Sequence, residues 1–150
     1  LRDFGGQAFN SMRLEKMYRA YGAEFTEEIS ALEAGMDRFL DLSRNFIGSD
    51  NIKQRKSDGV KTQLAYLIFD DETPAECFGN EAVFDEDELS GIITSGAYGY
   101  RVGHSIAFAY LNPSHCSEGK ALRVETSLGT RNCHVSLNAA YDNDNEKLRS

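Results

Sequence analysis

The stretch of sequence that decides the fold is SGAYGYRVGHSIAFAYL, residues 95–111. It contains three glycines within eight residues, Gly96, Gly99 and Gly103. This spacing predicts a turn at which a side chain beginning with Cβ would obstruct the backbone. Residues 106–111 follow and are apolar on both faces, as a buried strand requires. The stretch therefore predicts a glycine-rich turn that leads into a buried strand.

The sequence after Gly59 is typical of β-structure. Residues 60–69 are rich in β-forming side chains, and residues 122–128 and 133–137 alternate between apolar and polar positions. Further strands are predicted at residues 81–84 and 89–94, joined through the acidic residues 85–88, and a hairpin turn is predicted at residues 129–130. About six strands with few helices indicate a small antiparallel barrel or sandwich.

The sequence before Gly59 is more helical in character. Residues 8–21 have apolar side chains at helical spacing, and Gly22 is a suitable end for that helix. Ser30 and Glu33 have the spacing of a capping box. Residues 36–42 are predicted to be a strand, and residues 48–56 a short helix that Ser49 caps and Gly59 closes. The chain thus divides near Gly59 into two parts.

Charge, apolar runs and cysteine spacing argue against a nucleic acid, a membrane or a metal as a partner of this chain. The net charge is −8, so the chain has no basic excess with which to bind a nucleic acid. No apolar run is long enough to cross a bilayer, and no signal sequence opens the chain, so no membrane partner is expected. The three cysteines lack the spacing of a disulfide framework or a zinc site, so reduced thiols in the cytosol or the mitochondrial matrix, and no metal, are expected.

Five short strings occur in an order typical of one superfamily: RLEK at 13–16, YRAYG at 18–22, LEAGM at 32–36, NFIG at 45–48 and SGAYGYRVGHSIAFAY at 95–110. With these strings, the chain resembles the folate-dependent aminomethyltransferases, that is, the glycine cleavage T-protein and its relatives. It is most similar to the C-terminal region of dimethylglycine and sarcosine dehydrogenases. Because the chain starts at Leu1 within a helical approach, we expect it to be a fragment of a longer enzyme.

The resemblance implies an α+β fold with two parts. Residues 1–58 would be the end of a folate-binding domain, and residues 59–150 a C-terminal antiparallel β-barrel. It implies an enzyme that transfers a one-carbon unit from a small N-methyl amine to tetrahydrofolate, with FAD bound by an upstream domain and not by this chain. The pocket carboxylate of the family lies upstream, so no catalytic residue is assigned here, and the isolated chain is expected to have little or no activity.

Four residues are candidates for contact with folate: Arg13, Tyr21, Glu33 and Arg38. Arg13 matches the Arg of the family's RLE motif, but it could equally form a structural ion pair, for example with Glu33. Tyr21 could stack on an aromatic ring of folate or pack in the core. Glu33 could accept hydrogen bonds from the pterin or only complete the capping box. Arg38 replaces a folate-contacting Tyr of dimethylglycine dehydrogenases, and could attract the glutamate tail of folate or lie on the surface.

Two other functions remain open from the sequence. The first is a flavin-free aminomethyltransferase or demethylase of the T-protein type, which an upstream dinucleotide-binding fingerprint would argue against. The second is a non-catalytic barrel module for docking of a domain or partner, which a folded chain without folate affinity would favour.

Overall fold

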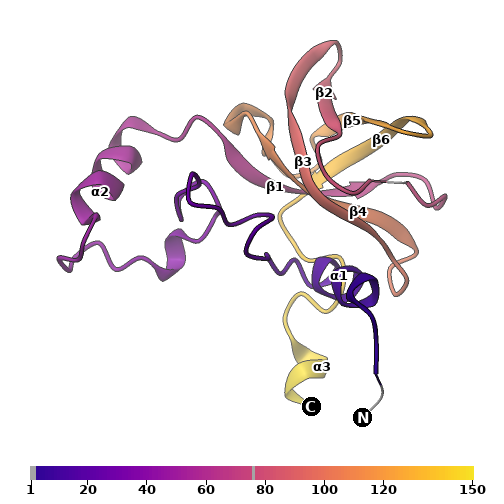
Figure 1. Cartoon of the computed structure of the whole chain (residues 1–150), viewed down its shortest axis with the longest axis horizontal. Helices are drawn as coiled ribbons and strands as arrows, with labels where there is room; N and C mark the ends of the chain where they lie inside the picture. Colours follow the sequence, from indigo (N-terminus) through magenta and orange to yellow (C-terminus); the bar gives the residue numbers. More distant parts are fainter. Residues whose placement is uncertain (1–2, 76) are drawn as a thin grey trace.

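The computed structural model describes residues 3–75 and 77–150 as a β-barrel with a helix-containing segment on one side (Figure 1). The N-terminal part contains helix α1 (Gly6–Glu15), the 3-10 turn η1 (Asp37–Phe39) and helix α2 (Ser49–Asp58). The strands are β1 (Gln63–Phe69), β2 (Ala82–Asp85), β3 (Glu88–Gly99), β4 (His104–Leu111), β5 (Ala121–Thr126) and β6 (Gly129–Ser136). A second 3-10 turn, η2 (Pro113–His115), follows β4, and the chain closes with helix α3 (Glu146–Arg149).

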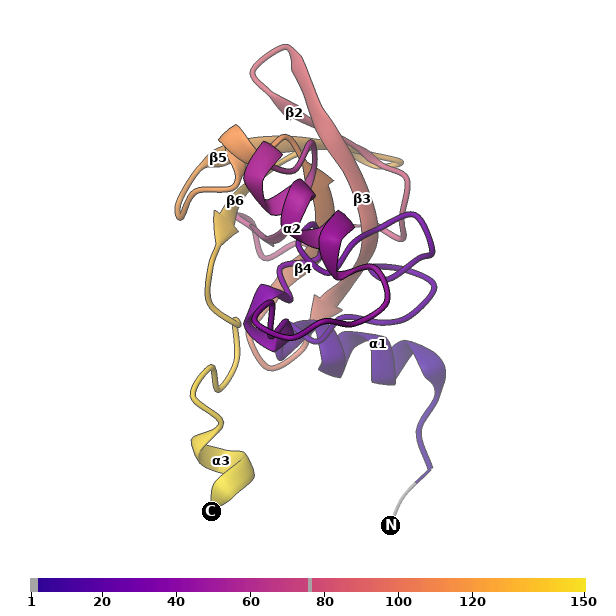
Figure 2. The same cartoon turned by 90° about the vertical axis from the view of Figure 1, so that its left-hand side faces the viewer.

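The six strands form a closed antiparallel barrel in the order β1-β4-β3-β2-β5-β6. Its seam is the pairing of β1 with β6, which places Leu67 opposite Val135. Helix α1 lies across one end of the barrel (Figure 2), and α2 stands apart from the barrel on a long segment (Figure 1). The predicted antiparallel barrel and the α+β class are confirmed, as is the acidic hairpin connection between β2 and β3.

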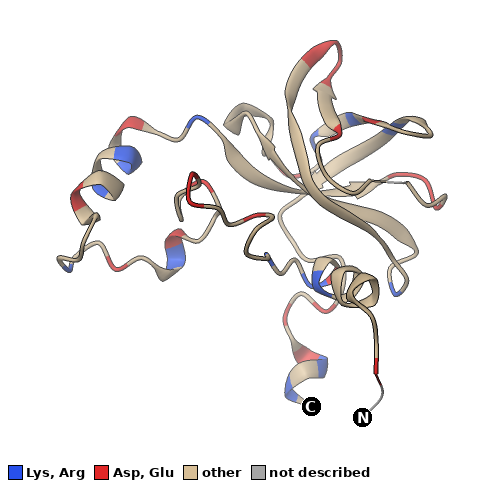
Figure 3. Ribbon diagram, in the orientation of Figure 1, with Lys and Arg blue, Asp and Glu red and all other residues tan. Residues whose placement is uncertain are grey.

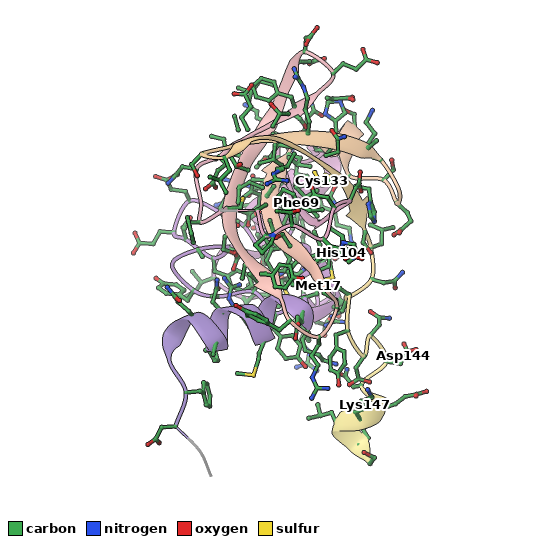
Figure 4. The ribbon with its side chains drawn as sticks, turned by 90° about the vertical axis from the view of Figure 1, so that its right-hand side faces the viewer. Met17, Phe69, His104, Cys133, Asp144 and Lys147 are labelled. Carbon is green, nitrogen blue, oxygen red and sulfur yellow. The ribbon has the colours of Figure 1, made fainter. Side chains whose placement is uncertain are left out.

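Strand β4 is buried on both faces because it separates two cores. Ala107, Ala109 and Leu111 face the barrel interior, together with Leu67 and Val135. The alternate residues Ile106 and Phe108 pack outside the barrel against Leu14 of α1 and Tyr66 of β1. Figure 4 shows Phe69 and Cys133 within the barrel and Met17 at the end that meets α1. This two-sided burial confirms the prediction made from residues 106–111.

The glycine-rich turn is shorter than predicted, because residues 95–99 belong to strand β3 and the turn spans residues 100–103. Gly96 is required by close packing within this strand and not by a bend. A Cβ atom there would lie 2.4 Å from the carbonyl oxygen of Cys77. The glycine spacing therefore predicted an obstructed Cβ correctly, but the predicted start of the turn was wrong.

The N-terminal part differs from the predicted elements in two places. Helix α1 ends at Glu15, because the chain reverses at Met17, whose φ is +57°. Residues 36–42 form the η1 turn and its flanks and not a strand, since no described strand lies beside them to pair with. Helix α2 is confirmed with Gly59 as its C-cap, although Gly48 and not Ser49 takes the N-cap position.

Burial protects the three thiols, which are free in this structure. Loss of hydration raises the pKa of Cys116 to about 11 and that of Cys133 to about 12, and it raises the pKa of Cys77 further. Because the thiolate is the reactive form, we expect all three thiols to react slowly with Ellman's reagent at pH 8 in the folded chain. Rapid reaction should follow unfolding in guanidinium. A thiol that reacts rapidly in the folded chain would contradict this placement.

None of the helices in the described part of the chain has the length and apolarity needed to cross a membrane.

Candidate ligand-binding site

An open cavity of about 860 Å³ lies beside helix α1. Most of its wall is apolar and aromatic. The lining residues are Phe4, Phe9, Met12, Arg13, Lys16, Tyr18, Arg19, Ala20 and Tyr21. Several of these large side chains are exposed, including Phe9 and Tyr21. An apolar cavity with a few polar groups is the usual character of a site for a small molecule.

Arg13 is the buried cation of this cavity, with 7% of its surface exposed. Its Nε donates to Asn10 Oδ1 at 2.9 Å, and its Nη1 donates to the Tyr18 carbonyl at 3.0 Å and to Glu24 Oε2 at 2.8 Å. Within residues 3–75 and 77–150, Nη2 makes no hydrogen bond, and it is not sealed from solvent. Nη2 of Arg13 is therefore available as a donor to a ligand.

Glu24 is the carboxylate that pairs with Arg13, and it is completely buried. The Ala20 amide also donates to Glu24 Oε2 at 2.8 Å, and Thr94 Oγ1 donates to Oε1 at 2.9 Å. The Ser95 hydroxyl donates to the same Oε1. A buried carboxylate must be paired and hydrogen-bonded in this way to be tolerated. Sequence reasoning required a carboxylate for Arg13 but did not identify Glu24.

Glu33 does not pair with Arg13, so that predicted ion pair is wrong. The Ser30 amide donates to Glu33 Oε2 at 2.7 Å, and Arg55 Nη1 donates to the same oxygen at 3.0 Å. The capping-box hydrogen bonds are thus present, but residues 31–35 form turns and no helix follows. Glu33 does not line the cavity beside α1.

Tyr21 and Arg38 lie on two neighbouring hollows. Tyr21 lines the apolar cavity and is 82% exposed; it is not on α1, as the predicted helix required. Arg38 lines a second, more polar groove of about 560 Å³. The two hollows share the side chains of Lys16, Tyr18 and Arg19 as a common wall.

The second groove is positively charged although the chain as a whole is acidic. The pKa of Arg19 is lowered, first by burial and second by the positive charge of the nearby Arg38. Arg19 donates from Nε to the Ala34 carbonyl at 2.7 Å, and Lys16 pairs with Asp142 at 3.0 Å. Acidic residues lie elsewhere, among them those at the tip of the β2–β3 hairpin (Figure 3). The groove is thus suited to an anionic group of a ligand.

Two family descriptions match the chain. Residues 63–142 match the "Glycine cleavage T-protein C-terminal barrel domain", and residues 1–44 match the "GCVT N-terminal domain". The first match covers β1 to β6 and the segment that follows the barrel, while the second covers α1, the cavity beside it and η1.

The chain is similar to enzymes of known activity. It is 38% identical over 126 residues to "Dimethylglycine dehydrogenase, mitochondrial" of Mus musculus, which covers 82% of this chain but 14% of that protein. It is 31% identical over 127 residues to "Aminomethyltransferase" of Corynebacterium aurimucosum, covering 83% of this chain and 34% of that protein. The chain thus spans a minor part of the curated relatives it matches.

A solved structure shares the fold. The glycine cleavage system aminomethyltransferase T of Bartonella henselae superposes with a TM-score of 0.81 over 91% of this chain and 38% of its own, at 19% identity. With the two family matches, these similarities extend over both the helical part and the barrel. The chain therefore belongs to the glycine cleavage T-protein family and contains its C-terminal barrel domain.

Proposed function

We propose that this chain is the C-terminal, folate-facing region of a dimethylglycine or sarcosine dehydrogenase-type enzyme, which transfers a one-carbon unit from an N-methyl amine to tetrahydrofolate. The observation that supports this most directly is Arg13, a buried arginine with one unpaired nitrogen in an aromatic cavity. The similarity to dimethylglycine dehydrogenase covers 82% of the chain.

The cavity has the chemistry that tetrahydrofolate needs. Its aromatic and apolar wall suits a flat heterocycle and an aminobenzoyl ring, and Arg13 can donate to a carbonyl or carboxylate oxygen. Bound tetrahydrofolate would serve as the acceptor of the one-carbon unit. We propose Arg13 and Tyr21 as contacts with its rings and Arg38 as a contact with its anionic tail. We propose that Glu33 contacts folate from outside this cavity. Its carboxylate would have to release the hydrogen bond from Arg55 before it could accept one from the ligand.

The exposed wall of the cavity supports a second part of the proposal. Phe4, Phe9 and Tyr21 present apolar surface that a lone domain rarely leaves open. We propose that upstream domains of the same enzyme cover it, and that FAD binds to those domains and not to residues 1–150. Residues 1–58 would then be the end of the folate-binding domain and residues 59–150 the barrel domain, acting in the cytosol or the mitochondrial matrix.

A flavin-free aminomethyltransferase is the second candidate. The Corynebacterium relative, at 31% identity, favours it. The coding sequence upstream of Leu1 distinguishes the two, because a glycine-rich dinucleotide fingerprint after a strand belongs to a flavin domain. Under either candidate the residues of this chain have the same task, which is to bind and orient folate.

The proposal is tested by calorimetric titration of the chain with tetrahydrofolate under reducing conditions. We expect saturable binding that weakens at least about tenfold in Arg13→Lys, because lysine keeps the charge for Glu24 but loses the forked donor, a loss of roughly 1.5–3 kcal/mol. Arg131→Lys is the control, since Arg131 pairs with Asp71 on the barrel surface.

Equal binding by the chain and by Arg13→Lys would overturn the assignment of Arg13. A folded chain that shows no binding would favour the non-catalytic barrel module.

A further inference from the structure

The completely buried Glu24 connects the ligand cavity to the barrel. Its carboxylate binds Arg13 on one side through the 2.8 Å ion pair, and receives hydroxyl hydrogen bonds from Thr94 and Ser95 of β3 on the other. Its backbone carbonyl accepts a 2.6 Å hydrogen bond from Tyr110 Oη of β4. Both ends of this residue are thus fixed by strands that lie 70 or more positions away in the sequence.

These contacts determine how the guanidinium of Arg13 is oriented. Two of its three nitrogens are engaged: Nε by Asn10, and Nη1 by Tyr18 and Glu24. A planar group held at two nitrogens cannot turn about its long axis without breaking a charged hydrogen bond. Its remaining donor, Nη2, therefore keeps one direction.

We propose that Glu24 is a positioning residue. It fixes the guanidinium of Arg13 relative to strands β3 and β4, so that the barrel determines where Nη2 meets a ligand. The group it would meet is an acceptor oxygen, a carboxylate or a carbonyl. The identity of that ligand as folate rests on the proposed function, but the orientation of Arg13 by Glu24 does not.

The orientation is measured without any ligand, by NMR of the chain labelled with nitrogen-15. In the wild type we expect slow rotation about the Nε–Cζ bond of Arg13, seen as separate Nη signals. Glu24→Gln should merge these signals, and Thr94→Val, which removes one hydroxyl donor to Glu24, should speed their exchange. Asp142→Asn is the control: it breaks the Lys16 ion pair near the same helix end and should leave the Arg13 signals unchanged.

Merged Arg13 signals in the wild type would overturn the proposal by themselves, even if Glu24→Gln did not fold. Unchanged signals in both Glu24→Gln and Thr94→Val would also overturn it.

Titration with tetrahydrofolate then measures the consequence for binding. We expect the dissociation constant to rise about tenfold in Glu24→Gln, with circular dichroism showing that the fold is kept. If the wild type binds no tetrahydrofolate, the proposed function fails while the NMR result still decides the role of Glu24. If the wild type binds and Glu24→Gln binds equally well, the positioning role is wrong while the proposed function stands.

Discussion

Gly91→Ala is expected to destabilise the barrel more than alanine at any other glycine of the described chain. A Cβ atom at this position would lie 1.9 Å from the carbonyl oxygen of Tyr110 and 2.9 Å from the Cα of Leu111. Both atoms belong to the backbone of β4, which pairs with Gly91 in the register of the barrel. Because neither can move without opening that pairing, we expect a loss of at least about 3 kcal/mol in the free energy of unfolding.

Chemical denaturation followed by circular dichroism measures this loss. Gly6→Ala is the matched control, because a Cβ atom there has nothing within 4 Å and alanine favours the helix by up to about 1 kcal/mol. A Gly91→Ala variant as stable as the Gly6→Ala variant would contradict the pairing of β3 with β4.

Arg13→Met is expected to lower the free energy of unfolding by about 3–5 kcal/mol. The variant leaves the carboxylate of Glu24, which is 0% exposed, without its cationic partner. Methionine fills much of the same volume, so lost packing contributes little to the change. The loss exceeds what an exposed ion pair supplies, about 1 kcal/mol or less.

The double variant Arg13→Met/Glu24→Leu separates the charge from the packing. Because it removes both charges, it should be more stable than Arg13→Met, and the two single effects should not add. Guanidinium denaturation of both single variants and the double variant gives this coupling. A loss below about 1 kcal/mol in Arg13→Met would show that the pair is not buried as described.

The barrel could be predicted from the sequence because its strands carry a local signal. The alternation in β5 and β6 and the continuous apolar run in β4 each follow from burial on one or two faces. Gly96 and Gly99 misled the prediction of the turn, since glycine serves both a bend and a close approach, and only the packed structure distinguishes them.

Less of the candidate site could be predicted from the sequence. Arg13 was identified from its match to the family's RLE motif and Tyr21 from its aromatic side chain. The two do line one cavity, but through a chain reversal at Met17 and not through a continuous helix. That reversal brings Glu24 to Arg13 and leaves Glu33 with Arg55. The only sequence signal for Glu24 was the need of a buried arginine for a carboxylate, and spacing alone could not show which glutamate supplies it.

The most direct test of the central claim is an NMR titration of the nitrogen-15-labelled chain with tetrahydrofolate. We predict that the largest shifts fall on the residues of the cavity beside α1, above all Arg13, Tyr18 and Tyr21, with smaller shifts at Arg38. The far hairpin of β5 and β6 should not respond. No shifts in the folded chain, or shifts confined to that hairpin, would contradict the assignment of this cavity to folate.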